Sequence, residues 1–260
     1  MIIFILPMDS RPPTLLKCPR CEAYYKRENW ASENTFGATL WSDGVLTDGM
    51  TGSEYDPIIC CRGCGHFFTP AEGWVKNTWG YSLPKDIKFF GSGSVTVDEA
   101  LAVLNNEPLL QKIGAAASPK TNVEKAGLSG QFQVRLLIWR RLNDKIRERG
   151  YAQLTQVESA RLHENTKALI PLIEFGTVDS DQAPILWKAE LQRNLGEFRK
   201  SITTLVEVHQ RSFRGAKRKM ILLNLVRNRH LVRLGSSKRG WPNMLTLWRS
   251  WVFGPPSSIV

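Results

Sequence analysis

Two pairs of cysteines, each pair separated by two residues, constrain the fold of this chain more than any other feature. The first is Cys18-Pro19-Arg20-Cys21 and the second is Cys61-Arg62-Gly63-Cys64. A turn of this kind, here called a knuckle, presents two thiolates to one metal ion, and two knuckles supply the four ligands of a tetrahedral site. We therefore predict one structural Zn²⁺ held by Cys18, Cys21, Cys61 and Cys64. Buried free thiols, or one redox-active pair, are the alternatives.

Two further candidate ligands stand next to the second knuckle. Cys60 would have to replace Cys61 with a wider spacing to Cys64, so we expect it to end a short strand and to point away from the metal. We expect His66 at the surface or beside the ligands rather than among them. A site of four thiolates is coordinatively closed, so no metal-bound catalytic water is predicted.

The insert between the knuckles is longer than a compact zinc finger requires. Within it, residues 36–41 predict a strand, Ser42-Asp43-Gly44 a turn, and Val45-Leu46 the returning strand. We therefore predict a zinc ribbon over residues 14–75 with an inserted β-hairpin. Residues 1–13 are expected to be a flexible N-terminus, in which Met1 or Met8 is the start.

The period of apolar residues changes to that of a helix after residue 130. Residues 76–130 predict a connector with one short helix near 98–105, and residues 131–235 predict a helical domain. Its helices are expected near 134–150, 155–169, 184–194, 198–209 and 213–234, and residues 236–260 form an aromatic C-terminal tail. The predicted class is α+β, with a small β-rich ribbon followed by an all-α domain of helical hairpins.

Net charge is concentrated in one segment. Of the net charge of +11, all is accounted for by residues 208–260, which contain eleven Lys and Arg and no Asp or Glu. On a continuous helix, five arginines of this segment share a sector of roughly 100° that could contact phosphate: Arg211, Arg214, Arg218, Arg229 and Arg233. Against this interpretation, the apolar turn 220–226 is expected to be buried, which would leave the cations as two solvated ends.

The tail is rich in tryptophan, with Trp241, Trp248 and Trp251 close together. A short segment of tryptophans and cations can lie on a membrane surface. We favour docking of these aromatic side chains on the helical domain. No stretch reaches the ~18 apolar residues that a membrane-spanning helix requires.

One helical pair is similar to a tetratricopeptide repeat. The small residues Ala189 and Ser201, the Leu195-Gly196 turn and Phe198 stand where such a repeat packs its two helices closely. Only one copy is recognisable, whereas solenoids need about three repeats. An ordinary αα-hairpin is the alternative.

Together, the knuckles, the segment 34–44, the helix 135–147 and the turn at 195–196 resemble a loosely defined set of uncharacterised bacterial proteins. These have an N-terminal zinc ribbon and a C-terminal tetratricopeptide-like domain. The resemblance implies this architecture and no known activity. The basic final helix, the Trp-rich tail and Cys60 depart from the pattern.

The sequence favours a non-enzymatic interaction or scaffold protein whose helical domain binds a protein partner. The alternative is a nucleic-acid-binding protein that uses the basic C-terminal helix and the ribbon. Zincin, P-loop, dinucleotide and nucleophile-elbow motifs are absent from the sequence, so neither catalysis nor a small-molecule substrate is predicted. An enzyme with an unrecognised site is the third alternative. Paired cysteines without an export signal predict a cytoplasmic protein.

Overall fold

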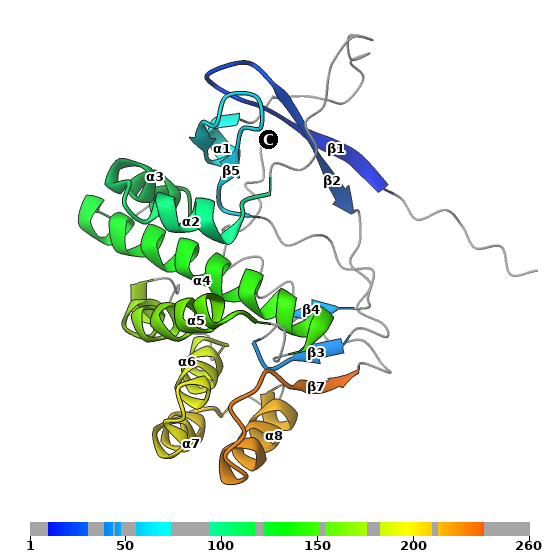
Figure 1. Cartoon of the computed structure of the whole chain (residues 1–260), viewed down its shortest axis with the longest axis vertical. Coiled ribbons are helices and arrows are strands. Elements are labelled where there is room, and N and C mark those ends of the chain that lie inside the picture. Colours follow the sequence, from blue (N-terminus) through cyan, green and yellow to red (C-terminus); the bar gives the residue numbers. More distant parts are fainter. Residues whose placement is uncertain are drawn as a thin grey trace, which may run out of the picture.

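The computed structural model describes residues 10–30, 39–43, 45–47, 56–73, 94–117, 122–150, 154–175, 183–209 and 213–236. Small antiparallel strand pairs are followed by a stack of helices, so the α+β class is confirmed (Figure 1). Within these ranges, no helix combines the length and the apolar composition needed to cross a bilayer. Of the predicted tail 236–260 only Ser236 is described, and residues 237–260 and the first nine residues lie outside the described part.

Two β-hairpins form what we call the ribbon unit. Strand β1 (Ser10–Lys17) pairs with β2 (Tyr24–Trp30), and β5 (Ile59–Cys60) pairs with β6 (Phe67–Phe68). Each hairpin carries one knuckle at its turn, and the short helix α1 (Pro70–Gly73) follows. The unit has a small core of its own, made of Leu16, Cys18, Tyr25, Ile59, Cys61 and Phe68.

The insert between the knuckles forms the predicted hairpin, but it does so away from the ribbon unit. Strands β3 (Thr39–Trp41) and β4 (Leu46–Thr47) pair with each other, and β3 also pairs with β7 (Arg233–Ser236). The sheet order is therefore β4-β3-β7, which joins segments from opposite ends of the chain. In Figure 1 this sheet lies beside the helices, apart from β1 and β2. Residues 36–38 and Gly44 of the prediction lie outside the described residues.

Helices make up most of the remaining chain. They are α2 (Val97–Val103), α3 (Glu107–Ala117), α4 (Val123–Arg149), α5 (Gln156–Leu169), the 3-10 helix η2 (Ile170–Phe175), α6 (Ala183–Asn194), α7 (Phe198–Val206) and α8 (Arg214–Leu225). Helices α5 and α6 match the predicted ranges, and the side chain of Thr155 caps α5 as part of a capping box. Helix α4 starts at Val123, earlier than its apolar period indicated, and α3 lies within the range predicted as a connector.

Glycines explain why the sequence signal for α3 and α4 is weak. A Cβ atom on Gly130 would lie 1.9 Å from the carbonyl oxygen of Leu110, and one on Gly114 would lie 1.8 Å from that of Ala126. The two helices therefore touch backbone to backbone. Such a contact needs small residues, and the first two turns of α4, residues 123–130, accordingly carry few of the large apolar side chains that make a helix recognisable from its period.

The main core surrounds α4 and extends into the ribbon unit. Phe132, Ile138, Trp139 and Leu142 of α4 are buried in it, together with Ile58 beside β5. Three ion pairs also join the two parts, each between the N-terminal segment 56–73 and a helix: Arg62 with Glu99, Lys112 with Glu72, and Arg141 with Asp56. The ribbon unit is consequently fastened to the helices by packing and by charge.

The turn of the insert is buried against α4. The carboxylate of Asp43 is completely buried and accepts hydrogen bonds from Asn143 Nδ2, at 2.9 Å, and from the guanidinium of Arg147. A carboxylate that is removed from water is destabilising unless its donors stay in place, so Asn143 and Arg147 must remain beside Asp43. Asp43 therefore anchors the insert to α4.

Ser42, the residue before Asp43, attaches the same turn to helix α6. Ser42 Oγ donates to Glu190 Oε1 at 2.7 Å and accepts from Arg193 at 3.3 Å, so it joins a buried ion pair of α6. The backbone amide of Ser42 donates to Val232 O at 2.9 Å, and Ser42 Oγ accepts from the Val232 amide at 3.1 Å, next to β7. We call Ser42 and Asp43 the insert anchor.

The helix predicted over residues 213–234 is shorter than expected. Helix α8 ends at Leu225, Arg227 adopts a φ of 52°, and the chain then forms β7. The expectation that residues 220–226 are buried all round is also wrong, since Leu222, Leu225 and Val226 are exposed. Among the described residues, α8 packs on α7 and α6 through a side that includes Ala216 and Met220, and these three exposed side chains lie on the opposite side of the helix.

Candidate metal centre

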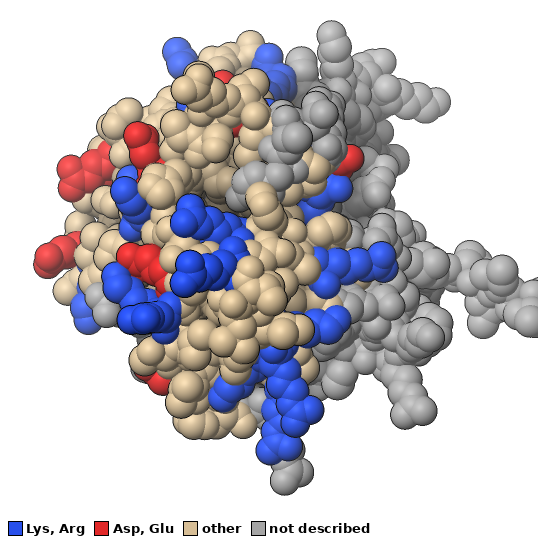
Figure 2. Space-filling model, turned by 60° about the horizontal axis from the view of Figure 1, so that its bottom comes forward, with Lys and Arg blue, Asp and Glu red and all other residues tan. Residues whose placement is uncertain are grey.

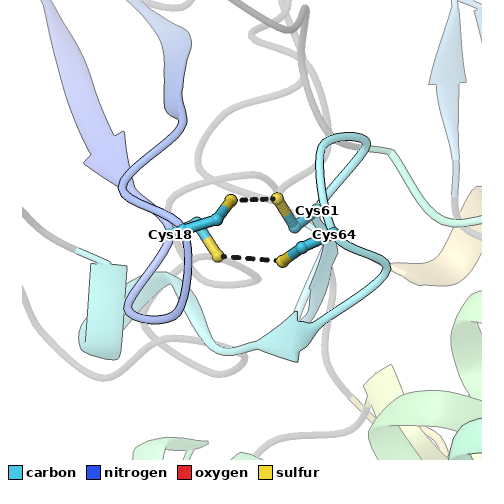
Figure 3. Close-up of side chains that lie close together, drawn as sticks. Cys18, Cys61 and Cys64 are labelled. Atoms are coloured by element: carbon cyan, nitrogen blue, oxygen red, sulfur yellow. Dashed lines mark hydrogen bonds between the residues drawn. The ribbon is translucent and has the colours of Figure 1, made fainter.

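The structure brings the four cysteines of the knuckles together. Their sulfur atoms all lie within 4.8 Å of one another, and this is the single group of three or more metal-type ligands found among the described residues. Cys18 Sγ lies 3.8 Å from Cys64 Sγ, and Cys21 Sγ lies 3.4 Å from Cys61 Sγ (Figure 3). Each short distance thus joins one knuckle to the other, and the side chains point toward a common centre.

The two knuckles have the same backbone structure. The amide of Cys18 donates to Ala23 O and the amide of Cys61 donates to His66 O, both at 2.8 Å. Each turn then closes through a residue with positive φ, which is Glu22 at 62° in the first knuckle and Gly65 at 71° in the second. Since glycine alone adopts this conformation without steric cost, the first knuckle is built with some strain.

Tyr25 lies beneath the site and was not expected from the sequence. Its hydroxyl donates to Cys61 Sγ at 3.1 Å and accepts from the backbone amide of Arg62 at 2.7 Å. Burial by itself raises the pKa of Cys61, but hydrogen bonds from Tyr25 and from nearby backbone amides outweigh burial and lower that pKa to about 6. Burial raises the pKa of Cys18. These hydrogen bonds therefore favour the thiolate form of Cys61, and a metal ion bound here would displace the protons of the other thiols.

Cys60 and His66 are not part of the cluster. Cys60 ends β5 and packs into the main core around α4, on the opposite side from Cys61, as the sequence predicted. Burial and the nearby Glu99 raise its pKa to about 11, so it stays a neutral thiol. The ring of His66 stacks on Phe68, with centroids 6.5 Å apart, while its carbonyl closes the second knuckle.

The geometry fits a tetrahedral metal ion. With metal–sulfur distances of ~2.3 Å, the edges of a sulfur tetrahedron are about 3.8 Å long, close to both short distances found here. A disulfide requires about 2.05 Å, so neither pair is oxidised in this arrangement, and all five cysteines are free. The four cysteines thus form a site able to bind a metal ion.

The five arginines predicted to share one helical face do not lie on one helix. Arg214 and Arg218 are exposed on α8, Arg229 follows the helix, and Arg233 belongs to β7. Arg211 lies outside the described residues. On the face shown in Figure 2, basic side chains are spread widely and acidic ones lie mostly toward the left edge. The geometric premise of one cationic stripe is therefore lost, whereas the cationic character of this end of the molecule remains.

Searches against protein-family models, curated proteins and solved structures give no match for this chain.

Proposed function

We propose that Cys18, Cys21, Cys61 and Cys64 hold one structural Zn²⁺ ion. The observation that carries this proposal is the set of four sulfurs within 4.8 Å of one another, because zinc is the usual ion of an all-thiolate tetrahedral site in proteins. The ion would supply folding free energy, on the order of 10 kcal/mol in small metal-dependent units. The ribbon unit needs such support because its own core has so few residues. Reduced thiolates also favour a cytoplasmic location.

We further propose that the protein is non-enzymatic and that its helical part binds a protein partner. Four thiolates fill a tetrahedral ion and leave no position for a reacting water. Helices α6 and α7 support the second half of the proposal, because they pack on each other as a helical hairpin whose sequence is similar to a tetratricopeptide repeat. Ser201 of α7 donates to the carbonyl of the fully buried Ala189 at 2.7 Å, so the two small residues meet as in such a repeat.

Nucleic-acid binding is the second candidate function. It is favoured by the absence of acidic residues from position 208 onward and by the basic face in Figure 2. It predicts an affinity that falls steeply as salt rises, and that falls further when Arg214 and Arg218 are changed to glutamate. Binding that is absent or insensitive to salt would remove this candidate.

The zinc proposal is tested by metal analysis of the purified full chain. We expect one zinc per chain, and cobalt substitution should give the thiolate charge-transfer absorption of a four-sulfur site. Cys64→Ser should lower metal affinity strongly, whereas the matched variant Cys60→Ser, next to the same knuckle, should keep full metal content. A content far from one ion per chain, or equal effects of the two serine variants, would refute the assignment.

The interaction proposal is tested by affinity purification of the tagged full chain after crosslinking in cells. We expect specific protein partners to be captured. Turnover of a substrate by the purified protein, with no specific protein partner recovered, would contradict it.

A further inference from the structure

The outer side of α8 carries a cluster of exposed aliphatic side chains. Leu222, Leu225 and Val226 are 60%, 66% and 64% exposed. The opposite side of the helix packs on α7 and α6 through buried residues that include Ala216 and Met220. Single exposed leucines are common on protein surfaces, but three within about one helical turn form a patch that favours contact with another molecule.

Cations flank this patch at both ends. Arg218 and Arg214 stand about one and two turns before Leu222, and all three lie within about a third of the helix circumference. Arg227 and Arg229 follow the helix and are exposed. The guanidinium of Arg229 lies over the Phe198 ring, 5.9 Å from its centroid, which holds this cation beside the C-terminal end of α8. We call Arg214, Arg218, Leu222, Leu225 and Val226 the α8 face.

The charges and the aliphatic residues of the α8 face argue against a second copy of the chain, nucleic acid and a membrane surface as the bound molecule. A second copy of the chain would set cations against cations, because residues 208–260 contain no acidic side chain to pair with them. Nucleic acid would pair with the arginines, but bases stack on aromatic rings and gain little from leucine or valine. A membrane surface calls for an apolar stripe along the whole helix, whereas α8 exposes aliphatic residues only toward its C-terminal end.

An acidic amphipathic helix would complement both the aliphatic side chains and the cations of the α8 face. Apolar residues at a spacing of three and four would cover Leu222, Leu225 and Val226, as one helix packs along another. Acidic residues beside that stripe would lie near Arg218 and Arg229. Electrostatic complementarity of this kind mainly sets specificity and the rate of association, while the apolar contact supplies most of the affinity.

We propose that the α8 face is the docking site for an amphipathic helical segment of a partner protein, with acidic residues flanking its apolar stripe. The proposal rests on the protein-binding function proposed above and names the chemistry of the partner.

The test uses the full-length, metal-loaded chain and a fluorescent synthetic peptide of about four helical turns. The peptide carries leucine at a spacing of three and four, with glutamate beside the leucines. A second peptide has the same composition in an order that leaves no apolar face. We expect fluorescence anisotropy to show tighter binding of the first peptide, and we expect Leu225→Asp to weaken that binding about tenfold or more.

Matched variants on another helix serve as controls. Val157 of α5 is 60% exposed, so Val157→Asp makes the same kind of change far from α8 and should leave binding unaltered. In the same way, Arg218→Glu should weaken binding, whereas Lys167→Glu on the exposed side of α5 should not. Circular dichroism should show that all four variants are folded. Equal binding of the two peptides, absence of binding, or equal effects of Leu225→Asp and Val157→Asp would overturn the proposal.

A photo-crosslinking residue at position 222 then identifies the natural occupant in cells that express the chain. A crosslinked protein segment with acidic residues around an apolar stripe supports the proposal. Crosslinks to lipid, to nucleic acid or to residues 237–260 of the same chain would overturn it. A partner that is captured equally well by the wild type and by Leu225→Asp would exclude the α8 face and still leave the proposed protein-binding function in place.

Discussion

Arg193 is completely buried, and its replacement by methionine tests how firmly the insert is held to the helices. Its side chain donates to Glu190 Oε2 at 2.9 Å, to Ser42 Oγ at 3.3 Å and to the carbonyl oxygen of His230 at 2.8 Å. Glu190 is equally buried. Arg193→Met keeps much of the side-chain volume, but it leaves a buried carboxylate and a backbone carbonyl without their main donor.

The expected cost follows from this geometry. Removing one partner of a buried ion pair costs about 3–5 kcal/mol, because the remaining charge stays desolvated. Urea unfolding of the metal-loaded protein can be followed by the fluorescence of the buried Trp139 and Trp187. With a slope near 3 kcal/mol per molar urea, the midpoint should fall by about 1–1.7 M.

Two further variants test whether the unpaired buried carboxylate is what destabilises Arg193→Met. Arg161→Met removes an ion pair with Asp98 in which both side chains are partly or largely exposed, so it should cost less than about 1 kcal/mol. The double variant Glu190→Gln/Arg193→Met should be more stable than Arg193→Met, because position 190 then carries no unpaired buried charge. An Arg193→Met variant that loses less than about 1 kcal/mol, or a double variant that is less stable still, would show that burial of the unpaired carboxylate is not the dominant cost.

Two further substitutions test the backbone arguments. Glu22→Gly should raise the free energy of unfolding of the metal-loaded protein by up to about 1 kcal/mol, since φ is 62° there and only an exposed ion pair with Lys17 is lost; a lower denaturation midpoint would contradict this. Gly130→Ala should lower the melting temperature, because its Cβ would lie 1.9 Å from a carbonyl oxygen of α3. The control Gly127→Ala, whose Cβ would meet nothing closer than 3.8 Å, should be neutral or stabilising by about 1 kcal/mol; equal effects of the two alanines would refute the close helix contact.

Features with a local chemical cause were predictable from the sequence. The four-cysteine cluster follows from two knuckles, since each turn already orients its own pair of sulfurs. The hairpin β3–β4 follows from its turn residues, and the start of α5 follows from the capping box that begins at Thr155. The opposite orientation of Cys60 and Cys61 follows from the alternation of side chains along a strand.

Features that depend on partners far along the chain were predicted incompletely or not at all. Helix α8 was expected to continue to residue 234, because nothing local stops it before Arg227. The pairing of β7 with β3 takes its last residues into a sheet instead. Tyr25 has no sequence signal as a donor to Cys61 Sγ, since residues 25 and 61 meet only when the two hairpins pack together.

Ser42 and Asp43 show which features the sequence determines and which features only the tertiary structure determines. By itself, the sequence determined that these residues form the turn of a hairpin, because short polar residues favour tight turns. Only the tertiary structure decided that this turn leaves the ribbon unit and enters the helical part, where Asn143, Arg147 and Glu190 bind it. The physical reason is that a buried polar residue takes its role from the donors and acceptors around it, and these come from helices a hundred or more positions away.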